Sequence, residues 1–223
     1  MDVAVDLNGK GQAMKKRPGK AYHHGDLRSG LLSAAAALLE EKGIAALSLR
    51  EVAKAAGVSH AAPYRHFRDK TALIEALAAE AFEQLAGGCE RARRRHPDDP
   101  ARQLVEAGLS YLFFSVERPA VVQLMFGGAP SLDSCGDELR AVADRAWESL
   151  VTLVRNGQAA GIYRDADTHD LTLVAWSTVY GLSLMVNSGL MPRPVKTRAG
   201  LKELGETVAG VLLSGMLVRE EQR

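Results

Sequence analysis

The sequence lacks the features of most secreted and membrane-spanning proteins. Only two of its 223 residues are cysteines, Cys89 and Cys135, so we expect free thiols in a reducing compartment and no disulfide framework, with a redox role left open. No apolar run is long enough to cross a bilayer. The first residues lack the apolar core of a signal peptide and include Asp2 and Asp6. We therefore expect a cytoplasmic protein without a membrane segment.

Aromatic residues and strand-like patterns are also scarce. Aromatic residues make up 5% of the chain and apolar residues 47%, with abundant Ala and Leu. Few runs of Val, Ile and Thr alternate as strands do, so an all-α fold is predicted. The net charge of only +1 excludes a uniformly basic nucleic-acid protein. Basic charge is instead concentrated locally, at Lys10, Lys15, Lys16, Arg17 and Lys20.

Motifs of common enzyme classes are missing as well. The sequence contains no Walker loop, no glycine-rich dinucleotide turn after a strand, no HExxH and no Gly-x-Ser-x-Gly. Its carboxylates are scattered over expected solvent-facing helix surfaces. We expect no enzymatic activity, no cofactor and no metal site.

The most informative stretch is SLREVAKAAGVSHAAPYRHF, residues 48–67. Ser48 is a typical N-cap residue, and apolar residues then recur at helical spacing from Leu49 to Ala56. Gly57 suits the positive φ of a helix end. Ser59 is expected to begin a second helix that runs to about His66. Two short helices around a tight corner predict a helix-turn-helix, whose second helix enters the major groove of DNA. The alternative is a helical hairpin in an unrelated α-protein.

Side chains of the second helix suit contact with DNA. Small or polar residues allow close approach to base edges, and hydrogen-bond donors reach phosphates. The positions expected to contact phosphates or to position the motif are Ser48, Arg50, Ser59, Tyr64, His66 and Lys70. The positions expected at base edges are Arg50, His60, Ala61, Ala62 and Arg65, the alanines through thymine methyls or close approach. Phe67 is the expected inward anchor, and Pro63 would strain a longer helix.

The segment AAGVSHAAPYRHFRDKTALIEAL resembles the DNA-binding domain of the TetR family of transcriptional regulators. The resemblance covers about Asp26 to Glu83, and the matching positions are Gly57, Val58, Ser59, Tyr64, His66, Phe67, Lys70 and Leu73. Pro63 departs from the family pattern. Residues 176–181, WSTVYG, look like a C-terminal subtype with a Trp-x-x-x-His-Gly motif, although Tyr180 replaces the usual His. Any role of that His therefore does not transfer.

Composition divides the chain into three expected parts. Residues 1–22 are expected to form a disordered basic arm, which either contacts DNA or is a solvated tail. Residues 23–86 form the predicted DNA-binding domain of three helices, and residues 87–223 a larger helical domain for effector binding and dimerisation. Asp26 is the expected N-cap of the first helix, and Gly43 its end. About nine helices are expected, with a bend or fraying of the fourth at Gly87 and Gly88.

The family resemblance implies two roles for the second domain. The last two helices are expected to form a four-helix bundle with a second copy, although the same faces also suit the domain's own core. Aromatic and Met residues suit an apolar effector pocket with polar handles, although each also suits plain core. The candidate pocket residues are Tyr111, Phe114, Met125, Phe126, Trp147, Trp176 and Tyr180.

The sequence therefore predicts a dimeric regulator that binds a palindromic double-stranded DNA operator. The family resemblance favours a repressor released by a small apolar or amphipathic effector. The alternatives are an activator or an architectural DNA-binding protein that responds to no effector. The sequence identifies neither the effector nor the operator.

Overall fold

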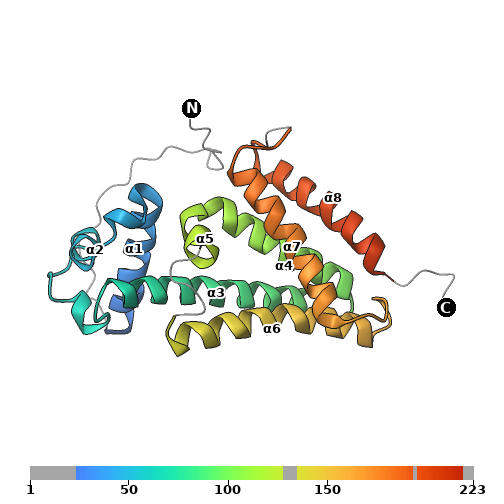
Figure 1. Cartoon of the computed structure of the whole chain (residues 1–223), viewed down its shortest axis with the longest axis horizontal. Coiled ribbons are helices and arrows are strands. Elements are labelled where there is room, and N and C mark those ends of the chain that lie inside the picture. Colours follow the sequence, from blue (N-terminus) through green and yellow to red (C-terminus); the bar gives the residue numbers. More distant parts are fainter. Residues whose placement is uncertain (1–23, 128–134, 193–194, 218–223) are drawn as a thin grey trace. The chain divides into compact units, whose positions relative to one another are not determined.

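The computed structural model describes residues 24–127, 135–192 and 195–217, and these residues form helices and their connections (Figure 1). This confirms the predicted all-α fold. The predicted basic arm, residues 1–22, lies outside the described residues. Nine helices were expected, whereas the described residues form eight α-helices and one 3₁₀ turn, η1. They are α1 (His24–Ala46), α2 (Leu49–Ala56), η1 (Pro63–Arg65), α3 (Lys70–Arg95), α4 (Pro100–Glu117), α5 (Pro119–Phe126), α6 (Asp137–Ala159), α7 (Thr168–Asn187) and α8 (Arg198–Met216).

The described residues divide into two compact units. The N-terminal unit contains residues 24–81, 118–127 and 135–141, and the C-terminal unit contains residues 82–117, 142–192 and 195–217. Helices α3 and α6 contribute residues to both units, whereas α5 belongs wholly to the N-terminal unit. The domain boundary expected near residue 86 remains a prediction.

The core of the N-terminal unit is built on the apolar stripe of α1. This stripe packs against α2 and α5, because side chains three and four positions apart share one helix face. The fully buried apolar side chains of this core include Leu31, Leu32, Leu39, Val52, Phe67 and Leu73. The burial of Phe67 confirms its predicted role as the inward anchor.

Of the two predicted ends of α1, the start is wrong and the end is supported by the backbone. The helix begins at His24, so the predicted N-cap at Asp26 is wrong, and Asp26 lies inside the first turn. The predicted end at Gly43 is supported by the backbone, because Gly43 has φ 74° and ψ 174°. Such a positive φ favours glycine. A short helical turn continues from this kink to Ala46.

Helix α3 begins at Lys70. Asp69 accepts a hydrogen bond from the N–H of Ala72 at 2.8 Å, which is the geometry of an N-cap. The bend or fraying expected at Gly87 and Gly88 is absent, since α3 is one helix from Lys70 to Arg95. Gly88 instead permits close packing, because a Cβ there would lie 3.0 Å from Ser110 Oγ of α4.

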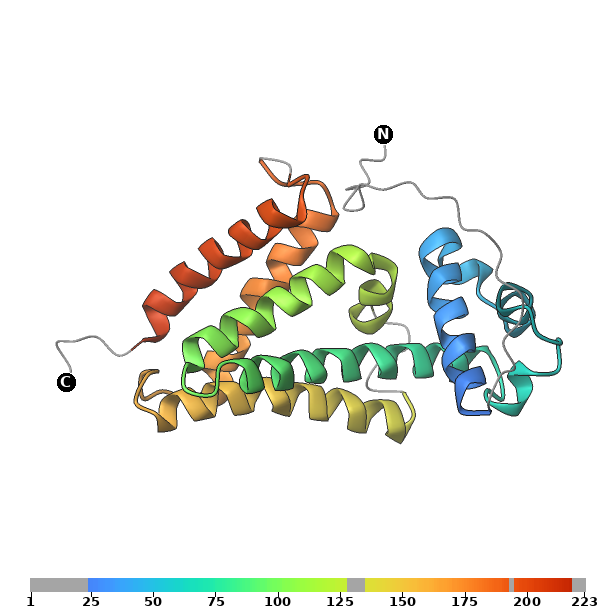
Figure 2. The same ribbon diagram turned by 180° about the vertical axis from the view of Figure 1, so that it is seen from behind.

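In the C-terminal unit, α4 packs against both α7 and α8 (Figures 1 and 2). Tyr163, in the connection between α6 and α7, is 2% exposed. Its hydroxyl donates to the carbonyl of Pro100 at 2.8 Å, which ties the connection to the start of α4. The ring lies directly on Gly157 of α6, where a Cβ would overlap ring atoms. Gly157 is therefore required by packing, because the hydrogen bond keeps the ring from moving aside.

We expect Gly157→Ala to lower the free energy of unfolding by about 1–3 kcal/mol, as other overpacked cores do. The control is Gly108→Ala in the middle of α4, where a Cβ would have ordinary contact at 3.9 Å from Val179 Cγ2. That control is expected to be neutral or stabilising by up to about 1 kcal/mol, since Ala favours helix over Gly. Urea denaturation of both variants measures the difference. Equal stability of the two variants would contradict the packing role of Gly157.

Candidate nucleic-acid interface

The corner after α2 has the geometry of a helix-turn-helix. Ser48 Oγ accepts from the N–H of Glu51 at 3.2 Å, which makes Ser48 the N-cap of α2. Gly57 ends the helix in the left-handed region at φ 69°. The N–H of Gly57 bonds to the carbonyl of Lys54, and the N–H of Val58 bonds to the carbonyl of Ala53. This pair of bonds is the Schellman arrangement that closes a helix end, and it confirms the predicted cap and corner.

The segment after the corner differs from expectation. The helix predicted for residues 59–66 is wrong, because the structure has a turn followed by the three-residue η1. The carbonyl of Ser59 accepts from Ala62 at 3.0 Å, and the carbonyl of Ala62 accepts from Arg65 at 3.2 Å. These are bonds over three residues rather than four. Pro63 explains the change, because it has no N–H to bond with Ser59 and its ring opposes the carbonyl four residues earlier.

We call residues 59–67 the recognition segment. Pro63 and Phe67 point into the core, whereas Tyr64 is 54% exposed. Most positions predicted to contact DNA are on the surface. The exposed ones are Arg50, Ser59, His60, Ala61, Tyr64, Arg65 and Lys70, and the half-buried ones are Ser48, Ala62 and His66. Their roles remain predictions, but the structure gathers them around one corner of the N-terminal unit.

Two cations near the recognition segment contact the protein itself. Lys70 Nζ donates to the carbonyl of Ile44 at 2.9 Å, which joins the start of α3 to the last turn of α1. The guanidinium of Arg28, on α1, lies 5.7 Å from the centre of the Phe67 ring, within the range of a cation–π contact. Sequence reasoning missed Arg28, because nothing local indicates that a residue 39 positions before Phe67 reaches its ring.

Three of the seven predicted effector residues lie together in the C-terminal unit. Tyr111 of α4 is 4% exposed, and its ring centre lies 4.8 Å from that of Trp176 on α7. Trp176 stacks on Tyr180 at 5.8 Å. The Tyr111 hydroxyl and Ser183 Oγ form a buried hydrogen bond at 3.2 Å. Burial raises the pKa of Tyr111 to about 12, so this hydroxyl stays neutral at physiological pH.

The other four predicted effector residues are more dispersed. Phe114 and Trp147 are half-buried in the C-terminal unit, on α4 and α6. Met125 and Phe126 lie on α5 and belong to the N-terminal unit. The seven residues therefore do not come from one compact unit, and a role in effector binding remains a prediction for each.

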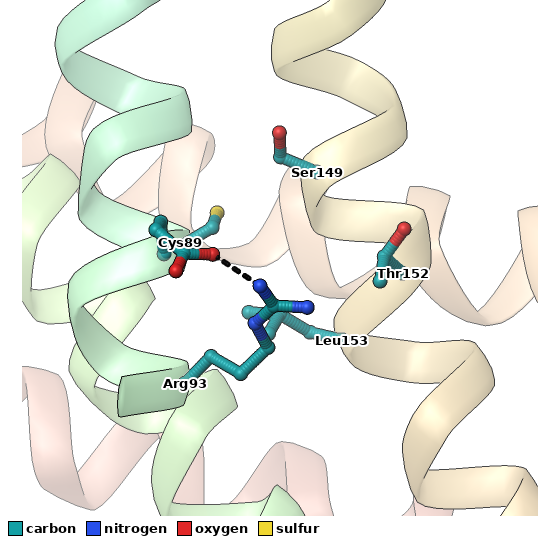
Figure 3. Close-up of a pocket in the computed structure, with 6 residues that line it drawn as sticks. Cys89, Arg93, Ser149, Thr152 and Leu153 are labelled. Carbon is teal, nitrogen blue, oxygen red and sulfur yellow. Dashed lines mark ion pairs between the residues drawn. The ribbon is translucent and has the colours of Figure 1, made fainter. Parts of the chain in front are cut away.

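A hollow of about 220 Å³ lies elsewhere, between α3 and α6 (Figure 3). It is lined by Cys89, Glu90, Arg93, Ser149, Thr152 and Leu153. Arg93 pairs at 2.7 Å with Glu90, three residues earlier on the same helix α3. Burial raises the pKa of the Cys89 thiol to about 11. Because the thiolate is the reactive form, Cys89 is poorly suited to a redox role at neutral pH.

Two kinds of feature are absent from the described residues. No helix there has both the length and the apolar character that crossing a membrane requires. Within the same part of the chain, no three His, Cys, Asp or Glu side chains are grouped in a way that holds a metal ion.

Comparison with protein families gives two matches along the chain. Residues 31–77 match the family described as "Bacterial regulatory proteins, tetR family". Residues 104–207 match the family described as "Tetracyclin repressor-like, C-terminal domain". The first match contains α2, the corner after it and the recognition segment, and the second contains Tyr111, Trp176 and Tyr180. The more specific Trp-His-Gly subtype remains a prediction.

Individual proteins are also similar to this chain. The chain is 30% identical over 113 residues to the nucleoid occlusion factor SlmA of Actinobacillus pleuropneumoniae, covering 51% of this chain and 54% of that protein. It thus spans about half the length of this curated relative. It is 26% identical to the HTH-type transcriptional regulator CymR of Pseudomonas putida, covering 76% of this chain and 83% of CymR. The structure of a protein of unknown function from Rhodococcus sp. RHA1 matches with a TM-score of 0.76 and 30% identity, covering 90% of this chain and 100% of that one.

The contact of Lys70 with Ile44 leads to a prediction about DNA affinity. Because its ammonium holds two helices together, Lys70→Gln is expected to weaken DNA binding while leaving the salt dependence of binding nearly unchanged. Arg50→Gln, at an exposed cation that is expected to contact phosphate, is expected to reduce the slope of log K against log salt by about 1. Fluorescence anisotropy at several salt concentrations measures both slopes. A loss of slope in Lys70→Gln equal to that in Arg50→Gln would instead assign Lys70 to a phosphate.

Proposed function

The chain belongs to the TetR family of DNA-binding transcriptional regulators, and we propose that it represses transcription in the bacterial cytoplasm as a homodimer on a palindromic operator. In this proposal, a small apolar or amphipathic effector releases the repressor from DNA. A dimer is required because one short recognition segment offers too few contacts for a specific site. Two segments related by a two-fold axis read half-sites about 34 Å apart.

The observation that carries the DNA-binding part is the exposed surface of the recognition segment. Pro63 and Phe67 anchor the segment in the core, and Tyr64 and Arg65 between them face solvent. The expected role of each side chain follows from its chemistry. Tyr64, His66 and other donors fix the register on phosphates, whereas His60, Arg65 and the alanines meet base edges.

The proposed dimer interface rests on apolar side chains that α7 and α8 leave exposed. Val211 of α8 is 71% exposed, and apolar side chains of α7 are exposed too, namely Leu173, Val174, Leu184 and Met185. Small residues between them, such as Gly181 and Gly210, allow two helices to approach closely. Exposed apolar clusters of this kind mark interaction surfaces in soluble proteins. Two helices from each copy would bury them in a four-helix bundle.

The proposed effector region is the aromatic cluster of Tyr111, Trp176 and Tyr180. It offers flat apolar surfaces together with hydroxyl groups, which suits an amphipathic small molecule. The effector must bind the released conformation better than the DNA-bound one, because only differential affinity shifts a population. Moving from mostly bound to mostly released takes about 5.5 kcal/mol of such difference. Helix α3, which contributes to both units, is the proposed carrier of the movement.

A second candidate is a DNA-binding role that responds to no effector. It is favoured by the similarity to a protein named nucleoid occlusion factor. The two candidates differ in DNA preference and in ligand response. A repressor prefers a short operator and is released by a ligand, whereas this second candidate keeps its DNA affinity in the presence of every ligand tried.

The test of the proposed function is selection of preferred duplexes from a random DNA pool by the purified protein, followed by affinity measurements at two salt concentrations. We expect a palindromic consensus and salt-sensitive, specific binding. Tyr64→Ala is expected to weaken binding to the consensus and to mutated sites by the same factor, since a phosphate contact carries no sequence information. A change confined to one base position would assign Tyr64 to base readout. The absence of any selected sequence would contradict the repressor proposal.

The dimer is tested by Val211→Glu. We expect this variant to be monomeric in analytical ultracentrifugation, because a charge would have to be buried unpaired in the bundle. The control is Ile44→Glu, which also replaces an exposed apolar side chain, on the N-terminal unit, and should leave the dimer intact. A dimeric Val211→Glu protein would place the interface on another surface.

A further inference from the structure

Helix α5 begins without a cap of its own. Its preceding residue, Arg118, makes no side-chain capping bond, and Pro119 has no N–H. The next two N–H groups, of Ala120 and Val121, both bond to the carboxylate of Glu40, each at 3.1 Å. Glu40 lies on α1, 80 positions before Ala120. A charged acceptor on the free N–H groups of a helix start makes strong hydrogen bonds and also favours the helix dipole.

Helix α6 begins in a related way. The N–H of Gly136, just before the helix, donates to the carboxylate of Glu75 on α3 at 3.1 Å. Glu40 and Glu75 both lie within the stretch matched by the DNA-binding family, residues 31–77. The helices whose starts they hold lie within the stretch matched by the C-terminal family, residues 104–207. Two carboxylates of the stretch matched by the DNA-binding family thus hold the starts of two helices in the stretch matched by the C-terminal family.

The other side of the same connection is fixed within the C-terminal unit. The carbonyl of Ser115, near the end of α4, accepts from Asn187 Nδ2 of α7 at 3.0 Å. Arg198, at the start of α8, pairs with Glu117 and lies 4.0 Å from the centre of the Phe113 ring. The end of α4 is therefore attached to both α7 and α8.

Between these two sets of contacts the chain has a single non-helical residue. Helix α4 ends at Glu117 and α5 begins at Pro119, with Arg118 at φ −138° and ψ 55° between them. The division between the compact units falls at this residue. A movement of α4 therefore reaches α5 after one residue, and α5 is hydrogen-bonded to α1, which packs on α2.

We propose that Glu40 is the coupling residue of this regulator: its clamp on α5 transmits the state of α4, α7 and α8 to the DNA-binding helices. This inference rests on the proposed function, because it assigns the residue through which regulation acts. In this scheme Glu40 contacts neither DNA nor effector. Its role is to couple the position of α4 to the position of α1, so that the two helices do not shift independently.

The test uses Glu40→Gln in the full-length protein, with Glu41→Gln as the matched control. Glu41 is the next residue on α1, and its side chain is 72% exposed. Amide hydrogen exchange is followed with and without the duplex selected by the wild-type protein. Coupling is reciprocal, so DNA bound at the recognition segment must alter exchange in α4 and α5. We expect this DNA-induced change in the wild type and in Glu41→Gln, and its loss or at least a threefold reduction in Glu40→Gln.

A purely local role of Glu40 predicts a different result. Losing a charged cap alone would speed exchange of the Ala120 and Val121 amides by about tenfold but leave the DNA-induced change in α4 intact. That outcome, or a wild-type protein whose α4 and α5 do not respond to DNA, would overturn the proposal. If Glu40→Gln fails to fold by circular dichroism, Glu75→Gln is measured in its place, with the expected loss at the start of α6. Failure of the wild type to bind DNA would instead refute the proposed function.

Discussion

Every α-helix begins with backbone N–H groups that its own turns leave unbonded, and the way this chain satisfies them governs its architecture. Five α-helices are capped by a side chain just before or at their start, from Ser48, Asp69, Asp99, Asp167 and Thr197. Helices α5 and α6 instead use carboxylates of distant helices. Local caps decide where a helix begins, whereas the distant ones also decide what that helix is attached to.

The difference between local and distant caps explains which parts of the fold could be predicted from the sequence and which could not. Ser48 and Gly57 act on neighbours within a few residues, so their spacing alone predicts α2 and its corner. The Glu40 clamp involves residues 80 positions apart, and a glutamate on an amphipathic helix gives no local sign of its partner. The grouping of α5 with the N-terminal unit was missed for the same reason, and with it the separation of Met125 and Phe126 from the aromatic cluster.

In the recognition segment, the predicted helix did not take account of the effect of Pro63 on the backbone. Tyr64, Arg65 and His66 fit a helix by composition, and the family resemblance implies one. Pro63 removes the N–H that a bond to Ser59 requires, so the backbone takes bonds over three residues around it. The consequence is modest for the predicted surface, because burial of Pro63 and Phe67 still orients Tyr64 and Arg65 outward. Two buried side chains thus fix the outward orientation that regular hydrogen bonding would fix in a longer helix.

The described chain passes between the two compact units at three places, and they differ in stiffness. Two of them fall inside the continuous helices α3 and α6, where twisting must break backbone hydrogen bonds. The third falls at Arg118, the single residue between α4 and α5, whose backbone angles of φ −138° and ψ 55° are not helical. A joint of this kind transmits nothing unless the segments on both sides are fixed. The contacts of Asn187 and Arg198 fix one side, and the carboxylate of the half-buried Glu40 fixes the other, which is the physical basis for the coupling role proposed for Glu40.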